Sequence, residues 1–304
     1  MAKVLVVTYS QSGQLEDIVA QVTHLFKGEV ELVVERLAPD PEYPFPWKGI
    51  DFYDTMPESV QMIPGKLKPF SFDSSESFDL IILGYPVWFL SPPIPITSFL
   101  KSKEAAQVMK NTPVVTVIGS RNMWVNAQEE IKRMIAANGG KLSGNISLRD
   151  RHNNLLSVVT IIYWMGTGKK DKYLGIFPNP GVSESDILGA RRFGQPILEA
   201  LRSNDFSTLQ DQLISLKAVE IDANVVSTEN KGKKIFKLWA SFVLKKGGAG
   251  DPARVFRLEF FKYYLLFVIF VVSPLVSLVF YLTYPLLYHR IKLKMKYYQS
   301  VSLK

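Results

Sequence analysis

Short apolar runs that alternate with helical segments constrain the fold of this chain more than any other feature. Residues 4–7, 80–83 and 114–118 are apolar runs typical of strands that are buried on both faces of a sheet. Residues 30–34 alternate apolar with polar side chains, which favours an edge strand, and a fifth strand is expected near 142–148. Between these runs, apolar residues recur at helical spacing.

This alternation predicts a doubly wound α/β fold, because two parallel strands need a right-handed crossover between them. We expect a five-stranded parallel sheet with the strand order 2-1-3-4-5. Ligands of such sheets bind at the carboxyl ends of the strands. The loops at 10–15, 84–95 and 119–124 follow three of these ends. We therefore expect these loops to lie together and to form the site.

The first loop has the composition of a phosphate-binding turn. Small hydroxyl residues and a glycine precede a helix, so the turn supplies backbone N–H groups, hydroxyls and a favourable helix dipole. A P-loop would need a Lys after the glycine, and a dinucleotide fingerprint would need three spaced glycines. The alternative is a serine-rich turn that only caps a helix. The residues expected at the phosphate are Ser10, Gln11, Ser12, Gly13, Gln14 and Leu15.

The other two loops offer aromatic faces, donors and one cation to a planar ligand. Packing alone is the alternative for the aromatic residues, but their position after the third strand favours ligand contact. Arg121 is suited to stabilise negative charge on a reduced ring or an enolate, and a solvated loop residue is the alternative. The residues expected here are Tyr85, Pro86, Val87, Trp88, Phe89, Gly119, Ser120, Arg121, Asn122 and Trp124.

Composition argues against a metal centre. The chain has no cysteine, and His24, His152 and His289 lie far apart in the sequence, so we expect no metal ligands. His152 follows the fifth strand and is the histidine nearest to the expected site. A histidine there could remove a proton next to a carbonyl, and a plain surface turn is the alternative.

The sequence divides into a first domain over 1–152 and several C-terminal segments. Within the domain, residues 38–70 are too long for an ordinary connection and are rich in proline and aromatic residues, so we interpret them as a lid. Residues 153–228 are predicted to form a helical extension. It includes an apolar helix at 155–165 and two polar-faced helices within 183–216.

The last part of the chain indicates a membrane. Residues 263–288 carry no charge and exceed the length of about 20 residues that crosses a bilayer. Residues 229–262 are expected to form a basic amphipathic linker on anionic lipid, and 289–304 a basic tail. Basic residues on both sides leave the orientation open, and Pro274 allows either a spanning helix or a re-entrant hairpin. We expect a membrane protein with a cytoplasmic catalytic domain, and no nucleic-acid partner.

Residues 4–15 resemble the phosphate loop of flavodoxins and flavodoxin-like quinone reductases, whose pattern is Thr/Ser-x-Thr/Ser-Gly-x-Thr. Ser10, Ser12 and Gly13 match, and Leu15 replaces the final Thr. The resemblance implies a flavodoxin-like fold with bound FMN. Over the whole chain, the sequence is similar to the membrane-associated dialkylresorcinol-condensing enzymes of aryl-polyene and flexirubin-type pigment pathways. The similar strings are 9–14, 43–47, Val87-Trp88, 121–124, 169–180 and the hydrophobic C-terminus.

That family name implies carbon–carbon bond formation, but the chain offers no thiol nucleophile. Our hypothesis is instead that an FMN-dependent enzyme aromatises a cyclohexanedione supplied by a pathway ketosynthase, giving a lipophilic dialkylresorcinol. His152 would be the base and Arg121 the enolate stabiliser. An NAD(P)H-dependent quinone reductase is the first alternative. A flavodoxin-type electron carrier or scaffold is the second.

Overall fold

The computed structural model describes residues 1–303 and contains one five-stranded parallel sheet. The strands are β1 (Lys3–Thr8), β2 (Glu31–Arg36), β3 (Leu80–Pro86), β4 (Pro113–Ser120) and β5 (Lys141–Arg149), in the order β2-β1-β3-β4-β5. This order confirms the predicted fold class and is that of flavodoxin-like sheets. As expected, β2 lies at one edge, and its side chains are mostly exposed.

Helix α1 (Gln14–Val22) packs closely over the middle of the sheet, against β3 and β4. Two strand glycines permit this approach. A Cβ on Gly84 would lie 2.8 Å from the Val19 side chain, and one on Gly119 would lie 3.2 Å from that of Ile18. Because a larger residue at either position would push the helix away, these glycines allow α1 to lie close against the sheet.

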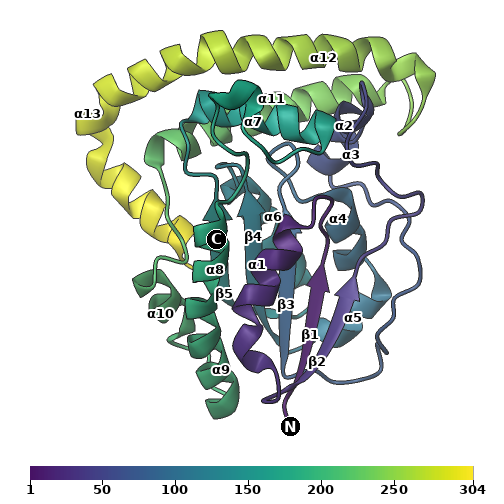
Figure 1. Ribbon diagram of the computed structural model, residues 1–304, viewed down its shortest axis with the longest axis vertical. Helices are drawn as coiled ribbons and strands as arrows, with labels where there is room; N and C mark the ends of the chain where they lie inside the picture. Colours follow the sequence, from purple (N-terminus) through teal and green to yellow (C-terminus); the bar gives the residue numbers. More distant parts are fainter. Residues whose placement is uncertain (304) are drawn as a thin grey trace.

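The remaining helices of the body surround this sheet (Figure 1). The chain passes through α2 (Asp51–Asp54) and α3 (Met56–Val60) before β3, and α4 (Ile94–Leu100) and α5 (Lys103–Met109) before β4. Helix α6 (Val125–Ala137) precedes β5. After the sheet come α7 (Asn154–Thr167), α8 (Glu184–Gly189), α9 (Gly194–Ser203), α10 (Leu209–Ser215) and α11 (Ala223–Leu244). The region 183–216 thus holds three α-helices rather than two.

The chain then forms one helical segment over 252–299. It comprises α12 (Val255–Phe267), a π-helical turn (Val268–Val272) and α13 (Ser273–Gln299), and its most apolar stretch has a mean hydropathy of 2.7 with 6% of the window buried. By length and composition, this is the one helix among the described residues that could cross a membrane. Figure 1 shows it running across the top of the molecule and then turning back down along α13.

Two expected features of the C-terminal part differ from the structure. The helix continues through Pro274, and the proline inside α13 is Pro285, so no hairpin break occurs at Pro274. The expected border between 228 and 229 falls inside α11. Lys233 and Phe236, which were expected to lie on lipid, are buried in the body because this face of α11 packs against it.

Candidate functional site

A cavity of about 150 Å³ lies at the carboxyl edge of the sheet. Its walls come from the three predicted loops, the lid and α7, and Figure 1 shows α7, α11 and α12 layered above this end of the sheet. The volume is below the roughly 300 Å³ or more typical of small-molecule sites. A planar cofactor would therefore need more space than the cavity offers in this conformation. The lining residues are Ser10, Gln11, Ser12, Gln14, Leu15, Phe45, Trp47, Phe52, Pro86, Val87, Trp88, Gly119, Ser120, Arg121, Ile161, Trp164, Met165 and Gly181.

The polar end of the cavity is the loop before α1. Gly13 has φ 79°, a left-handed conformation that glycine adopts without strain, and it caps the helix without a side-chain hydrogen bond. Among the described residues, the backbone N–H groups of residues 10–13 have no acceptor, and the side-chain amide nitrogen of Gln11 is buried without a partner. Unpaired donors gathered at a helix N-terminus are suited to bind an anion, and a phosphate at this loop stays a prediction.

The loop is held in place by a distant segment. Gln14 Nε2 donates to the Val182 carbonyl oxygen at 3.1 Å, and the Val182 N–H donates to Gln14 Oε1 at 3.0 Å. Beside them, a Cβ on Gly181 would lie 2.7 Å from both Gln14 Oε1 and a ring carbon of Trp164. The phosphate loop is thus closed on one side by the segment before α8.

The aromatic end of the cavity is built around Trp88. Its ring is buried and meets Tyr43, Trp47 and Tyr9 edge-on, with centroid distances of 5.2, 5.8 and 5.7 Å. Tyr43 and Trp47 belong to the predicted lid, and the Trp47 N–H donates to the Met165 carbonyl oxygen of α7 at 2.8 Å. The lid is therefore fastened across the cavity by both ring contacts and a backbone hydrogen bond.

Arg121 provides the positive charge in the cavity wall. Its Nη1 donates to Asn154 Oδ1 at 2.7 Å and to Ser157 Oγ at 3.1 Å, both in the first turn of α7. Burial lowers the pKa of the guanidinium to about 10, so the group stays charged at neutral pH. The neighbouring Ser120 hydroxyl is buried without a partner. The end of β4 and the residue after it thus provide one unpaired hydroxyl, that of Ser120, and one fixed cation, Arg121.

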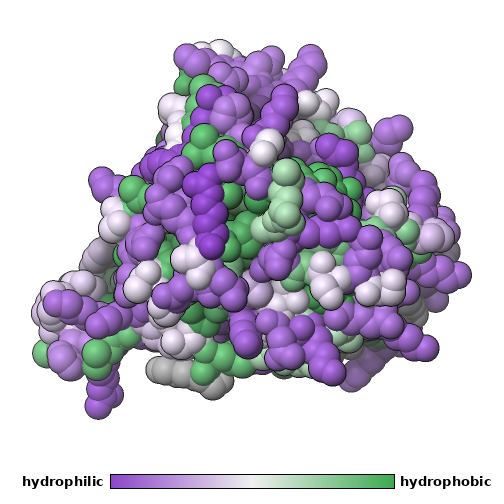
Figure 2. Space-filling model, turned by 90° about the horizontal axis from the view of Figure 1, so that it is seen from below, coloured by the Kyte–Doolittle hydropathy of each residue, from purple (hydrophilic) through white to green (hydrophobic). Residues whose placement is uncertain are grey.

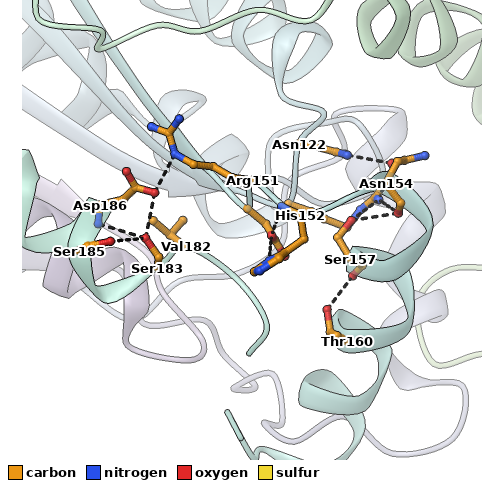
Figure 3. Close-up of polar contacts among 12 residues, drawn as sticks. Asn122, Arg151, His152, Asn154, Ser157, Thr160, Val182, Ser183, Ser185 and Asp186 are labelled. Atoms are coloured by element: carbon orange, nitrogen blue, oxygen red, sulfur yellow. Dashed lines mark hydrogen bonds and ion pairs between the residues drawn. The ribbon is translucent and has the colours of Figure 1, made fainter. Parts of the chain in front are cut away.

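His152 lies at the entrance to α7, outside the cavity lining. Its Nδ1 is 2.7 Å from Asp150 Oδ1, and Asp150 is buried, whereas the histidine side chain is 41% exposed. Figure 3 shows His152 between Arg151, which pairs with Asp186, and the first turn of α7 with Asn154 and Ser157. The carboxylate orients the ring as in other His–Asp pairs.

Five other predicted site residues also lie outside the lining. Tyr85 is fully buried and donates from its hydroxyl to Gln128. Phe89 stacks on Phe52 at 4.4 Å and faces α11 and α12 rather than the cavity. The remaining three are Gly13, which shapes the phosphate loop, Asn122, which donates to Asn154 Oδ1, and Trp124, which is buried before α6.

Seven lining residues were not predicted individually. Phe45, Trp47 and Phe52 come from the lid, and their aromatic character was the signal that this segment packs over something. Ile161, Trp164 and Met165 come from α7, and Gly181 from the loop after it. Nothing in their local sequence separates them from ordinary core residues, because only the path of the chain after β5 returns them to the site.

No family model matches this chain, and no curated protein matches it. Similar solved structures include flavoproteins. A flavoprotein in complex with FMN from Lactobacillus acidophilus NCFM is 19% identical, with 48% of this chain and 93% of that chain covered and a TM-score of 0.40. A flavodoxin from the domain Archaea is 12% identical, with 66% of this chain and 99% of that chain covered and a TM-score of 0.36. RosB with a bound flavin intermediate is 11% identical, with 71% of this chain and 81% of that chain covered and a TM-score of 0.37.

The fold class follows from the strand order β2-β1-β3-β4-β5 itself. In residues 1–303, no group of three His, Asp or Glu side chains is arranged to hold a metal ion.

Proposed function

We propose that this chain is an FMN-dependent oxidoreductase that acts on a lipophilic cyclic substrate. The observation that carries the proposal is the cavity itself, which joins unpaired donors at the start of α1 to a wall of buried aromatic rings. A phosphate and a flat aromatic ring are the two ends of FMN. The residues that would hold it are those of the loop 10–14 at the phosphate and Trp47, Trp88 and Trp164 around the ring.

The reaction that we propose is aromatisation of a cyclohexane-1,3-dione to a dialkylresorcinol. FMN, when bound, supplies the capacity to accept a hydride. The substrate loses one proton and one hydride, so its ring gains the unsaturation of the resorcinol and both carbonyls become hydroxyl groups. Arg121 would stabilise the enolate oxygen, and His152, oriented by Asp150, would take the proton. This assignment also draws on the resemblance of the chain to dialkylresorcinol-condensing enzymes.

The first experiment is an absorption spectrum of the purified chain before and after incubation with FMN. We expect a flavin band that persists through gel filtration. Protein that shows no bound flavin under either condition would overturn every flavin function for this chain.

The second experiment is a single turnover without oxygen. Mixing the FMN-loaded protein with a dialkylcyclohexane-1,3-dione should bleach the flavin and yield one dialkylresorcinol per flavin, identified by mass spectrometry. Replacing His152 with Ala should slow this step by about 10² or more, whereas His24→Ala should leave it unchanged. If the holoprotein reduces quinones with NADPH and leaves the dione untouched, the chain is a quinone reductase instead.

A further inference from the structure

The apolar helical segment 252–299 presents a continuous hydrophobic outer face. Its side chains are exposed along most of its length, although residues of this type are normally buried in a globular protein. The most exposed of them are Phe256 at 77%, Tyr263 at 66%, Tyr281 at 61%, Leu282 at 71% and Leu286 at 87%. An exposed apolar face of this size marks a surface that binds a protein or a membrane.

The first end of the segment is fixed to the lid. Arg254 is fully buried, and its guanidinium pairs with Asp54 Oδ1 at 2.5 Å and with Glu58 Oε1 at 2.7 Å. Seven residues further on, Phe261 is also fully buried and meets Phe89 and Phe236 at centroid distances of 6.1 and 5.5 Å. These contacts hold the start of α12 against the body.

The second end returns to the same body beside α6 and α10. Tyr297 Oη donates to Glu129 Oε2 at 2.6 Å, and Gln210 Nε2 donates to the Gln299 carbonyl oxygen at 2.7 Å. Lys132 Nζ donates to the Ser302 carbonyl oxygen at 3.1 Å. The middle is also attached, because Asn224 Nδ2 of α11 donates to Ser277 Oγ at 3.1 Å.

A helix that crosses a bilayer separates its ends by the roughly 30 Å of the hydrocarbon core. Here both ends contact one globular body, so a crossing would require one set of these contacts to break. We infer that the segment does not cross: it lies in the plane of an anionic membrane, with its outer face immersed in one leaflet and both flanks on the same side.

Charge argues for anionic lipid as the occupant of this face. The flank after the apolar stretch carries four exposed basic residues, Arg290, Lys292, Lys294 and Lys296, and residues 260–304 contain no Asp or Glu. Such a combination of apolar surface and basic flanks is typical of helices at the interface of anionic bilayers. Figure 2, viewed from the opposite end, shows a surface that is mostly hydrophilic, so that end is less suited to a membrane than the apolar segment.

The topology is testable with single-cysteine variants because the chain has no cysteine of its own. Gly248→Cys lies before the segment in open space, and Lys296→Cys lies after it at an exposed position. The full-length variants would be added to preformed vesicles of phosphatidylcholine and phosphatidylglycerol and treated with a membrane-impermeant maleimide. We expect both positions to react equally without detergent. Protection of position 296 until detergent is added would show a crossing and overturn the inference.

The occupant is tested separately with Leu286→Cys carrying a fluorophore. We expect quenching by nitroxide groups on the lipid acyl chains. A fluorophore that these lipids do not quench, in a protein that dimerises as its concentration rises, would assign the face to a second copy and refute membrane immersion.

The charge contribution has a matched control. Changing Arg290, Lys292, Lys294 and Lys296 together to Gln should weaken binding to anionic vesicles by about tenfold or more, since each basic residue adds to the attraction. The same change at Lys27, Lys103, Lys110 and Lys141, four exposed lysines on the body, should leave binding within about twofold. Equal losses in the two quadruple variants would refute the assigned surface. These experiments do not depend on flavin binding, so their failure is distinguishable from failure of the proposed function.

Discussion

Arg254 and Glu58 form a buried two-pronged ion pair, with Nη1–Oε1 and Nη2–Oε2 distances of 2.7 and 3.0 Å. The pair joins the start of the long apolar segment to α3, which follows the cavity-lining part of the lid. Phe52 of the same lid lines the cavity. The lid therefore contacts both the cavity and the start of the apolar segment.

Removing this arginine should destabilise the protein strongly, because a buried carboxylate loses its partner. We expect Arg254→Ala to lower the free energy of unfolding by about 3–5 kcal/mol in chemical denaturation of the detergent-solubilised chain. Arg290→Ala, at an exposed position, should change it by less than about 0.5 kcal/mol. Equal effects of the two substitutions would show that the pair contributes no special stability.

Gly181 should be required for flavin affinity. A Cβ there would collide with Gln14 and Trp164. Gly181→Ala should therefore displace both the Gln14 side chain, which holds the loop 10–14, and the Trp164 ring in the aromatic wall. We expect the dissociation constant for FMN, measured by quenching of flavin fluorescence, to rise about tenfold or more, which corresponds to about 1.4 kcal/mol. Gly175→Ala is the matched control, since Gly175 has a similar φ of +70° but open space around it. If both substitutions weaken FMN binding to the same extent, backbone strain is the cause of the loss, and the contacts with Gln14 and Trp164 are not.

Arg121 should affect turnover more than cofactor binding. Replacing it with Gln removes the charge beside the expected enolate oxygen, and loss of one such stabilising group costs about 10²–10³ in kcat. The measurement is steady-state kcat with the dione, alongside the FMN dissociation constant and the melting temperature. Arg151→Gln, which removes an exposed cation paired with Asp186 and Glu220, should leave kcat within about threefold. An unchanged kcat in the Arg121 variant would exclude this role.

Glu229 should make stability depend on pH. The carboxyl is buried, with Oε1 accepting from the Asn126 N–H at 2.6 Å, and burial raises its pKa to about 7. In the unfolded chain the pKa returns to its ordinary value near 4.5. Between these two values the folded chain binds more protons, so the free energy of unfolding falls as pH rises from about 5 to about 7.

Denaturation of Glu229→Gln across this range should show a weaker dependence on pH, because the amide does not titrate. Glu199→Gln, at an exposed position, should retain the slope of the unmodified protein. The range stays below pH 8 because burial also lowers the pKa of nearby Lys233 to about 8, and that group acts with the opposite sign at higher pH. Identical slopes for the unmodified protein and Glu229→Gln would contradict this account.

The sheet could be predicted because its strands are local patterns. Five apolar runs, alternating with helical segments, were enough for the order that the structure confirms. The three loops could be placed together because carboxyl ends of parallel strands share one edge.

The rest of the cavity depends on contacts between distant parts of the chain. Gln14 meets Val182 across 168 positions, and Arg254 meets Glu58 across 196. No local pattern encodes such pairs. The same holds for Phe89 and Trp124, whose aromatic rings could serve a ligand or the core equally well from sequence alone, and which pack in the core because α11, α12 and α6 lie against them.

The two hydrogen bonds between Gln14 and Val182 have a kinetic consequence. They tie the loop 10–14 to the segment around Gly181, so we expect release of a bound phosphate to require an opening in which both hydrogen bonds break. Exchange of the cofactor would then proceed at the rate of that opening, independent of the concentration of free flavin in solution. Holoprotein diluted far below the dissociation constant for its flavin should release the flavin slowly. Gln14→Ala removes the two hydrogen bonds and should therefore accelerate the release.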